Sequence, residues 1–371
     1  MSDYDITQID VDEHDTTNGE YNSLVMIDST HAILAYQGGG NYGIIKTFLI
    51  NGSHELSTID SFTYLEGSII HNSLVKVDDT HYMLAYSTAT KGYIKTFSID
   101  GNYDISLVDT YEYLGTATTH NSLAKLDGTH YMLAYQGPDS DGFIKTFTID
   151  ANADNIAEVD VLEQETDFID GQSSLVAIDS THAILAYQGP DYDGFIKTFS
   201  CDAAGTNIAQ VAVLEYDTAQ GGEPSMVKIN ATHFAVAYNG GGAVIKTFSI
   251  DGSYENITML KSLKHSSGNG RWNSIVMIDS THFILSYMDC VGGYGLWIKT
   301  FSMDGSYELT ELDSLEHNAS FQTYSPTSLV KLEDAYYMLA YQGADYDGFV
   351  KTFSLDIASD TGTGAFFQFF N

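Results

Sequence analysis

Ile144-Lys145-Thr146-Phe147 is the stretch that decides the fold, because these four residues, or a variant that differs at one of them, occur seven times. The copies begin at Ile45, Ile94, Ile144, Ile196, Ile245, Ile298 and Val350. Their spacings are 49, 50, 52, 49, 53 and 52 residues, so the period accounts for almost all of the 371 residues. A fixed period of this length indicates a repeat architecture, in which each repeat is one supersecondary unit. The copies also serve as internal controls: a residue present in all of them indicates scaffold, and a departing copy is a candidate for function.

The second copy shows how one repeat is organised. It contains four runs rich in β-branched and aromatic residues, at 71–77, 81–86, 92–99 and 105–113, separated by clusters of Asp, Gly, Asn and Ser. Seven units of four short antiparallel strands resemble a seven-bladed β-propeller, which predicts an all-β fold over residues 1–355. The chain lacks Trp-Asp repeats and sialidase-type Asp boxes, and it has only two tryptophans. The resemblance is therefore to the architecture and not to a functional family.

The two ends of the chain predict how the ring closes. Residues 6–13 match the fourth run of a repeat, whereas the last copy has three runs and no fourth. We therefore expect the N-terminal strand to complete the last blade, which leaves no unpaired blade edge where the ring begins and ends. Residues 356–371 fall outside the repeat and consist of a polar linker and a Phe-rich tail at 365–371. This tail either folds back onto the propeller or docks into another subunit or assembly.

The composition limits the classes of partner. The formal net charge is −35, from 50 acidic and 15 basic residues, so nucleic acid and anionic membranes are poor partners. No apolar run is long enough for a transmembrane helix, so no membrane insertion is expected. No signal peptide is visible. The acidic, repetitive chain nevertheless suits an extracellular or surface-exposed protein.

The lysine of the tetrapeptide is present in every copy, which favours a scaffold role. The seven lysines are Lys46, Lys95, Lys145, Lys197, Lys246, Lys299 and Lys351. We expect their stems to lie along aromatic side chains and their ammonium groups to form a repeated inter-blade or cross-strand ion pair. A ring of cations for an anionic ligand is the alternative.

Six copies carry Thr-His at the start of the second strand, with Asp or Asn three residues before the histidine. The histidines are His31, His81, His130, His182, His233 and His282. Equivalent positions around a sevenfold ring lie too far apart to share one metal ion. We therefore expect a turn-capping cluster of hydrogen bonds among Asp, Thr and His.

Three loops between the second and third strands carry Asp-x-Asp-Gly, a good hairpin turn that also supplies carboxylates to Ca²⁺. The candidate metal ligands are Asp139, Asp141, Asp191, Asp193, Asp345 and Asp347. Calcium takes six to eight oxygen ligands, and two carboxylates per loop fall short of that number. No cofactor is required by the sequence, and Ca²⁺ remains the candidate ion.

The repeat symmetry breaks most strongly around the sixth blade. Lys261 and Lys264 replace acids of other copies, and the following loop holds the only arginine, Arg271, beside Trp272. The other tryptophan, Trp297, follows an enlarged loop that contains Tyr294. Arg and Trp are enriched at binding hot spots, so these six residues form the predicted ligand-binding site. The alternative is that the cations relieve repulsion between acidic blades and that Trp297 packs in the core.

No nucleophile elbow, zinc motif or phosphate loop is present in the sequence. The leading hypothesis is a non-enzymatic, lectin-like binding or scaffold propeller that recognises a glycan or a protein partner. A carbohydrate-active hydrolase or lyase on a propeller scaffold is the first alternative, by analogy with the fold alone. A structural subunit of a surface assembly, docked or self-associated through residues 365–371, is the second.

Overall fold

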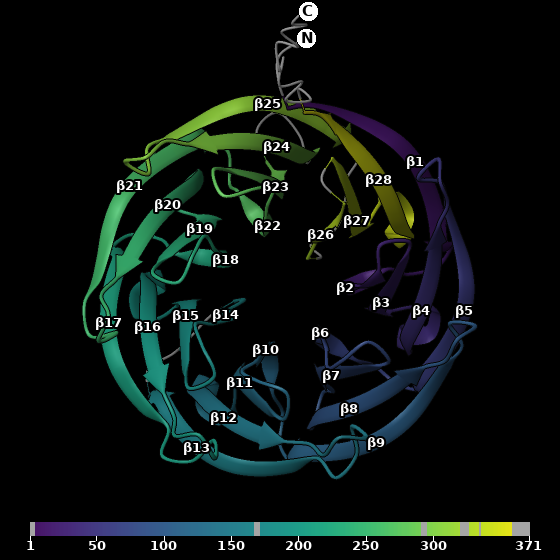
Figure 1. Ribbon diagram of the computed structural model, residues 1–371, viewed down its shortest axis with the longest axis horizontal. Coiled ribbons are helices and arrows are strands. Elements are labelled where there is room, and N and C mark those ends of the chain that lie inside the picture. Colours follow the sequence, from purple (N-terminus) through teal and green to yellow (C-terminus); the bar gives the residue numbers. More distant parts are fainter. Residues whose placement is uncertain (1–3, 167–170, 291–294, 320–325, 334, 358–371) are drawn as a thin grey trace, which may run out of the picture.

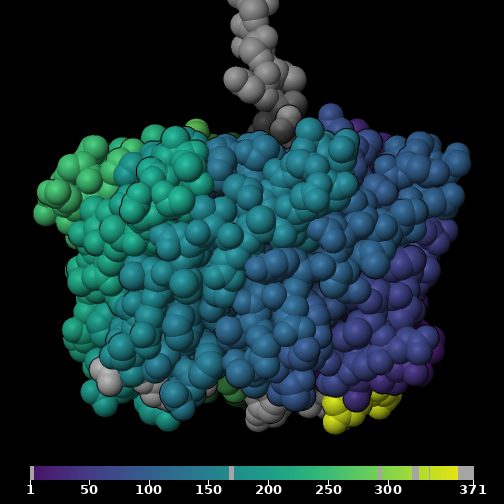
Figure 2. All heavy atoms as spheres, turned by 90° about the horizontal axis from the view of Figure 1, so that it is seen from below, coloured from purple at the N-terminus to yellow at the C-terminus, as the bar shows by residue number. Residues whose placement is uncertain are grey.

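Seven four-stranded sheets stand side by side in a ring around a central axis (Figure 1). The computed structural model describes residues 4–166, 171–290, 295–319, 326–333 and 335–357. Tyr294 and the Phe-rich tail at 365–371 lie outside these residues. Figure 2 shows the ring edge-on, with neighbouring blades packed against one another along its outer wall. Among the described residues, no helix is long and apolar enough to cross a membrane.

Blades 1 to 6 run from the axis outwards in chain order, blade 7 ends on β1, and all strands are antiparallel to their neighbours. Blades 1 to 3 are β2 (Glu20–Asp28), β3 (His31–Gln37), β4 (Gly43–Ile50) and β5 (Leu56–Leu65); β6 (Ile70–Lys76), β7 (His81–Ser87), β8 (Gly92–Ile99) and β9 (Ile105–Leu114); and β10 (Thr119–Lys125), β11 (His130–Gln136), β12 (Gly142–Thr148) and β13 (Ala157–Glu165). Blades 4 and 5 are β14 (Ser174–Ala177), β15 (His182–Gln188), β16 (Gly194–Ser200) and β17 (Ala209–Asp217); and β18 (Gly222–Lys228), β19 (His233–Asn239), β20 (Ala243–Ile250) and β21 (Ile257–Ser266). Blades 6 and 7 are β22 (Arg271–Met277), β23 (His282–Asp289), β24 (Gly295–Met303) and β25 (Leu309–Asn318); and β26 (Ser328–Glu333), β27 (Tyr336–Gln342), β28 (Gly348–Asp356) and β1 (Asp5–Asp15).

The predicted seven-bladed ring and its closure are confirmed. β1 pairs antiparallel with β28, with Ile6 opposite Leu355 and Val11 opposite Lys351. The N-terminal strand thus supplies the outer strand of blade 7, and main-chain hydrogen bonds join the first and last parts of the propeller. This pairing covers the strand edge that the last repeat leaves open.

The apolar core is divided among the junctions between blades. One cluster of buried side chains lies at each of the seven junctions, including the one between blades 7 and 1. The second and third strands supply most of each cluster, and residues such as Tyr36, Phe48 and Ile45 are fully buried. A single blade has no core of its own, so its apolar faces are buried only when the ring is complete.

The repeated tetrapeptide binds both neighbouring blades at once. Each of the seven lysines donates from Nζ to a main-chain carbonyl in the outer strand of the preceding blade, as Lys145 does to Tyr113 at 2.6 Å. Each adjacent threonine donates from Oγ1 to a carbonyl of the following blade, as Thr146 does to Gly205 at 2.6 Å. Consecutive residues of a strand face opposite ways, so one motif can join three blades.

The lysine prediction is correct for burial and incomplete for the partner. Six of the seven lysines are less than 10% exposed, so their stems are buried as expected. Within the described part of the chain, four of them also form ion pairs: Lys145 with Glu158, Lys197 with Glu165, Lys246 with Asp217 and Lys299 with Glu311. The partner common to all seven is a carbonyl oxygen, which an analysis of side-chain identities cannot reveal.

The predicted turn-capping clusters are confirmed at all six histidines. His31 Nδ1, for example, lies 3.0 Å from Asp28 Oδ1, and the other five follow the same pattern with Asp or Asn. We call the face of the ring that carries the loops between second and third strands the upper face. The histidine turns lie on the opposite, lower face. The histidines therefore belong to the scaffold of the lower face.

Candidate functional site

One position of the repeat carries six different residue types in its seven copies, with histidine in two of them. It lies two residues before the serine that is present in all seven innermost strands. The variable position is Tyr21, His71, His120, Gln172, Glu223, Trp272 and Pro326 in blades 1 to 7. The serine is scaffold, because its Oγ accepts the main-chain N–H of the next blade's first strand in every copy. A variable residue fixed this close to an invariant one is a candidate for recognition.

Backbone geometry sets the direction of these side chains. Five of the seven have a positive φ between 51° and 55°, a region that residues other than glycine adopt only when the surroundings hold them there. In the next blade, the asparagine that follows the variable position supplies that support. Asn72 Nδ2 donates to the carbonyl of Tyr21 at 3.1 Å, and Asn121 Nδ2 donates to the carbonyl of His71 at 3.1 Å. The scaffold thus fixes the main chain of a position whose side chain varies.

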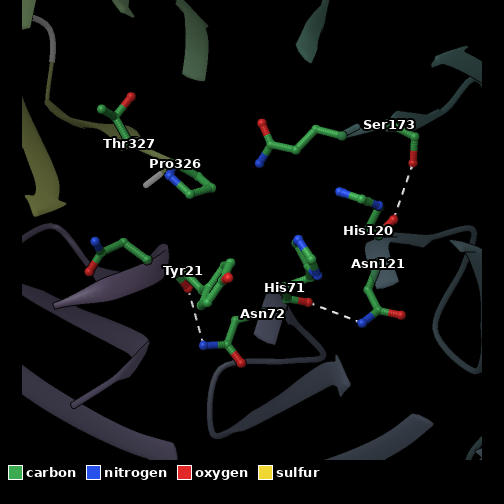
Figure 3. A pocket seen from close by; sticks show the side chains of 10 residues that line it. Tyr21, His71, Asn72, His120, Asn121, Ser173, Pro326 and Thr327 are labelled. Carbon is green, nitrogen blue, oxygen red and sulfur yellow. Dashed lines mark hydrogen bonds between the residues drawn. The ribbon is translucent and has the colours of Figure 1, made fainter. Parts of the chain in front are cut away.

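Several of these side chains converge on a cavity at the ring axis, which we call the axial cavity (Figure 3). Its ten described lining residues are Tyr21, Asn22, His71, Asn72, His120, Asn121, Gln172, Ser173, Pro326 and Thr327. The rings of His71 and His120 lie 4.1 Å apart, and Tyr21 packs edge-on against His71 at 4.9 Å. The cavity has about 70 Å³ of room, enough for about five waters if each needs about 10–15 Å³.

The axial cavity is electrically neutral in a protein of charge −35. None of its ten described lining residues is Asp, Glu, Lys or Arg. Burial, and secondarily the neighbouring His120, holds the pKa of His71 well below its usual value, so this imidazole is uncharged at neutral pH. Nδ1 of His71 is buried and has no hydrogen-bond partner among the described residues, so it is available to a ligand. Such a lining fits an uncharged polar ligand better than an ion.

Glu223, the variable position of blade 5, forms an ion pair with Arg271, which precedes the variable position of blade 6. Arg271 donates from Nε and Nη2 to Glu223 Oε1 at 3.0 and 2.7 Å, and Glu223 Oε2 accepts the main-chain N–H of Trp272 at 2.9 Å. The carboxylate side chain is 8% exposed and the guanidinium is 33% exposed. The guanidinium therefore already neutralises a buried anion of its own chain.

The predicted ligand residues lie in three places rather than in one patch. Arg271 and Trp272 are adjacent at the inner strand, with the guanidinium carbon 5.7 Å from the indole centre. Trp272 packs in the cluster between blades 6 and 7, whereas Trp297 packs in the cluster between blades 5 and 6. Trp297 also lines a separate pocket of about 360 Å³ in blade 6. Tyr294 lies outside the described residues.

The two predicted lysines lie on the outer strand β21, away from the axis. Lys261 forms an ion pair with Glu308 of the next blade at 2.7 Å, and Lys264 donates to the carbonyl of Gly241 at 2.8 Å. In five other blades an Asp at the position of Lys261 accepts a main-chain N–H of the next blade, as Asp10 does from Leu56. Lys261 thus replaces one inter-blade contact with another.

The six candidate calcium ligands occupy three similar upper-face turns. Asp139, Asp191 and Asp345 each adopt a positive φ of 56–57° inside a short 3₁₀ turn. In the described part of the chain, no three His, Cys, Asp or Glu side chains are grouped to hold a metal ion. A calcium site at these loops remains a prediction.

The axial position does not stand out in the sequence as one copy that differs from six others. At this position the seven copies carry six residue types, so no consensus exists to depart from. The available signal was a highly variable position followed two residues later by an invariant serine. Only the ring geometry shows that this position faces the axis.

No protein-family model matches the sequence, and no curated protein matches it. Solved structures do share the fold. A protein from Lactobacillus plantarum has a TM-score of 0.63 at 15% identity, covering 85% of this chain and 90% of that one. A putative 6-phosphogluconolactonase from Bacteroides fragilis has a TM-score of 0.63 at 14% identity, covering 86% of this chain and 89% of that one. Sqt1 from Chaetomium thermophilum, bound to the N-terminus of ribosomal protein L10, has a TM-score of 0.57 at 13% identity, covering 96% of this chain and 100% of that one. Likeness at these identities shows the fold alone.

Proposed function

We propose that this protein is a non-enzymatic binding propeller that holds part of a glycan or protein partner in the axial cavity. One observation carries the proposal: the seven copies carry six different residue types at one structurally fixed position, and several of these side chains line a shared cavity. A scaffold position would keep one residue in all copies, as the neighbouring serine does. Variation at a fixed position is what selection for an asymmetric ligand would produce on a symmetric ring.

The chemistry of the cavity supports non-covalent recognition of an uncharged polar group. Tyr21, His71 and His120 supply aromatic surface, and the amides and hydroxyls around them offer both donors and acceptors. Ligand pockets commonly combine apolar or aromatic walls with a few oriented polar groups. Sqt1, which shares the fold, is a propeller with a bound peptide segment, so protein recognition suits this architecture too.

A phosphosugar lactonase is supported less well by the same cavity. A phosphorylated substrate calls for cationic groups, and the ten described residues of the axial lining include no Lys or Arg. Arg271, beside the cavity, is bound by Glu223. An uncharged ligand avoids separating that pair.

The test is a binding screen with matched variants. Labelled protein is applied to a glycan array and to a peptide library, and Tyr21→Ala and His71→Ala are compared with wild type. Each is expected to weaken binding of the selected ligand at least tenfold, about 1.4 kcal/mol. Tyr346→Ala, which truncates an exposed tyrosine away from the cavity, serves as control and is expected to bind normally.

Two results would overturn the proposal. One is binding that is unchanged in both cavity variants while the fold, checked by circular dichroism, is intact. The other is catalytic turnover of a lactone or glycoside panel that disappears in the cavity variants, which would make the axial cavity an active site.

A further inference from the structure

Blade 5 has a shortened loop on the upper face of the ring. Its loop between second and third strands is three residues, Gly240 to Gly242, because β19 ends at Asn239 and β20 begins at Ala243. The same loop in blade 4 has five residues, 189–193, because β15 ends at Gln188 and β16 begins at Gly194. Blade 5 therefore has two fewer residues than blade 4 in this upper-face loop.

A pocket of about 220 Å³ is lined by Asn239, the residue that precedes the shortened loop, and by residues of blades 4 to 6; we call it the blade-5 pocket. Its described lining residues are Gly171, Gln188, Tyr192, Gln220, Gly222, Glu223, Asn239 and Arg271. It adjoins the axial cavity, because Gly171 precedes Gln172 of the axial lining and Glu223 holds the variable position of blade 5. The two hollows are therefore neighbours on one face of the ring.

Tyr192 stands at the rim of the blade-5 pocket on a turn that is held rigidly. Its side chain belongs to a residue that is 57% exposed, although a tyrosine ring is largely apolar. Asp191 and Tyr192 both have positive φ, 56° and 67°, and consecutive residues in this region are strained unless they are fixed. Gln188 Nε2 and the main-chain N–H of Gly221 fix them by donating to the carbonyl of Tyr192 at 3.0 and 2.9 Å. The main chain that carries the ring is thus ordered before binding, which lowers the entropy cost of binding.

Asn239 supplies an unused acceptor inside the pocket. At the equivalent position blades 1, 3, 4 and 7 carry glutamine, and Gln188 and Gln342 each use Nε2 to bind a carbonyl of their own loop. Asparagine is one methylene shorter. Asn239 is 5% exposed, and its buried Oδ1 has no hydrogen-bond partner among the described residues. A buried acceptor without a donor is costly, so a ligand hydroxyl at this place gains a well-placed hydrogen bond.

We infer that the blade-5 pocket is a subsite for one unit of an uncharged saccharide whose neighbouring unit occupies the axial cavity; this rests on the proposed function. A sugar ring has an apolar C–H face, which suits the exposed ring of Tyr192, and a rim of hydroxyls that both donate and accept. Asn239 Oδ1 accepts from one hydroxyl, and Gln220, which also lines the pocket, offers an amide. The ion pair of Glu223 and Arg271 forms part of the wall with its charges already matched, so no charge is required of the ligand.

The experiment is calorimetric titration with neutral cello-, xylo-, manno-, laminari- and chito-oligosaccharides and the matching disaccharides. Wild type is expected to bind at least one series, more tightly as an oligosaccharide than as the disaccharide. Tyr192→Ala is expected to weaken the oligosaccharide at least tenfold, and Tyr192→Phe to retain most of the affinity because the stacking surface remains. Asn239→Gln, which restores the residue of four other blades and extends it into the pocket, is expected to weaken binding without loss of stability.

Blade 7 provides the matched control. Tyr346 is 56% exposed on a turn with the same positive φ values at Asp345 and Tyr346, 57° and 72°. Tyr346→Ala is expected to leave the affinity within twofold of wild type. An equal loss in Tyr346→Ala and Tyr192→Ala would overturn the subsite, because it would indicate a nonspecific aromatic effect.

The remaining outcomes separate the subsite from the proposed function. Saccharide binding that falls in His71→Ala but not in Tyr192→Ala overturns the subsite and supports the axial cavity alone. Absence of binding to every series overturns the saccharide assignment. If a peptide from the library then binds and depends on His71, the binding function stands with a protein partner.

Discussion

Lys145 Nζ lies 2.6 Å from the carbonyl oxygen of Tyr113, two residues on different blades that are 32 positions apart in sequence. The next residue, Thr146, binds the blade on the other side. The same pair of contacts recurs at all seven junctions, so the most repetitive motif in the sequence fastens the ring rather than a ligand. This assignment leaves recognition to the positions that vary.

Replacement of one of the seven buried lysines should lower the stability of the fold. Lys145 is 5% exposed and also pairs with Glu158 at 2.7 Å. Lys145→Ala is expected to lower the free energy of unfolding by about 3–5 kcal/mol, because a buried acceptor and a carboxylate lose their partner. Urea unfolding measures the change. Lys91→Ala, which breaks the exposed ion pair with Glu112, is the control and should barely change stability. Equal effects of the two variants would contradict the role of Lys145 in joining the blades.

Ring closure depends on a strand that can be removed and returned. Deletion of residues 1–14 takes away most of β1 and leaves the edge of β28 unpaired. We expect loss of cooperative folding or aggregation, measured by light scattering and thermal unfolding. A synthetic peptide of residues 4–15, added in trans, should restore the monomeric fold. A deleted protein that is monomeric and as stable as the full chain would contradict the closure.

Buried histidines should make the fold sensitive to mild acid. Burial, with the nearby Lys46, lowers the pKa of His14 to about 3, and burial with Lys299 lowers that of His265 to about 3. Because the unfolded chain binds these protons near the usual value of 6.5, stability is fully present above that pH and is lost as pH falls from 6.5 toward 3. For each of the two histidines, the free energy of unfolding is expected to fall by about 2 kcal/mol by roughly pH 5, because the unfolded state then binds a proton that the folded state does not. Equal free energies of unfolding at about pH 7.5 and about pH 5 would show that these side chains are not buried as neutral groups.

His14→Tyr should remove its share of this sensitivity and stabilise the fold. Blades 1 and 2 carry Tyr64 and Tyr113 at the equivalent position, and their hydroxyls donate to Asn72 and Asn121. The corresponding Oδ1 of Asn22 is buried without a partner among the described residues. The new hydroxyl is expected to donate to it, adding about 1 kcal/mol at neutral pH. Urea unfolding at both pH values measures the gain. His14→Phe, which lacks the hydroxyl, is the control without that hydrogen bond.

The Arg271–Glu223 pair has a structural role that can be measured apart from ligand binding. Arg271→Ala leaves the buried Glu223 carboxylate without its cation, and about 1–3 kcal/mol of stability should be lost. Glu223→Gln in the same chain should restore part of it, because the uncompensated charge is then gone. Urea unfolding of the single and double variants measures the coupling. Strictly additive effects would show that the pair contributes nothing to the fold.

The fold could be predicted largely from the sequence because seven copies state the same pattern. The period gives the blade count, the runs within a repeat give the strands, and the missing fourth run of the last copy matches the extra strand at residues 6–13. The site could not be predicted in this way. Arg271 and Trp272 do lie near the axis, but Lys261, Lys264 and Trp297 are elsewhere, because unusual residues in neighbouring loops need not face the same direction.

The sequence by itself therefore determined the repeat, the number of blades and the closing strand, because strand periodicity and turn chemistry are local properties of a chain. Only the tertiary structure decided which carbonyl oxygen each of the seven lysines binds, because every residue has a main-chain carbonyl and the side chains do not distinguish one carbonyl from another. It also decided the axial cavity. His71 and His120 are 49 positions apart in sequence, yet their rings lie 4.1 Å apart because closure of the ring turns the same position of adjacent blades toward one axis.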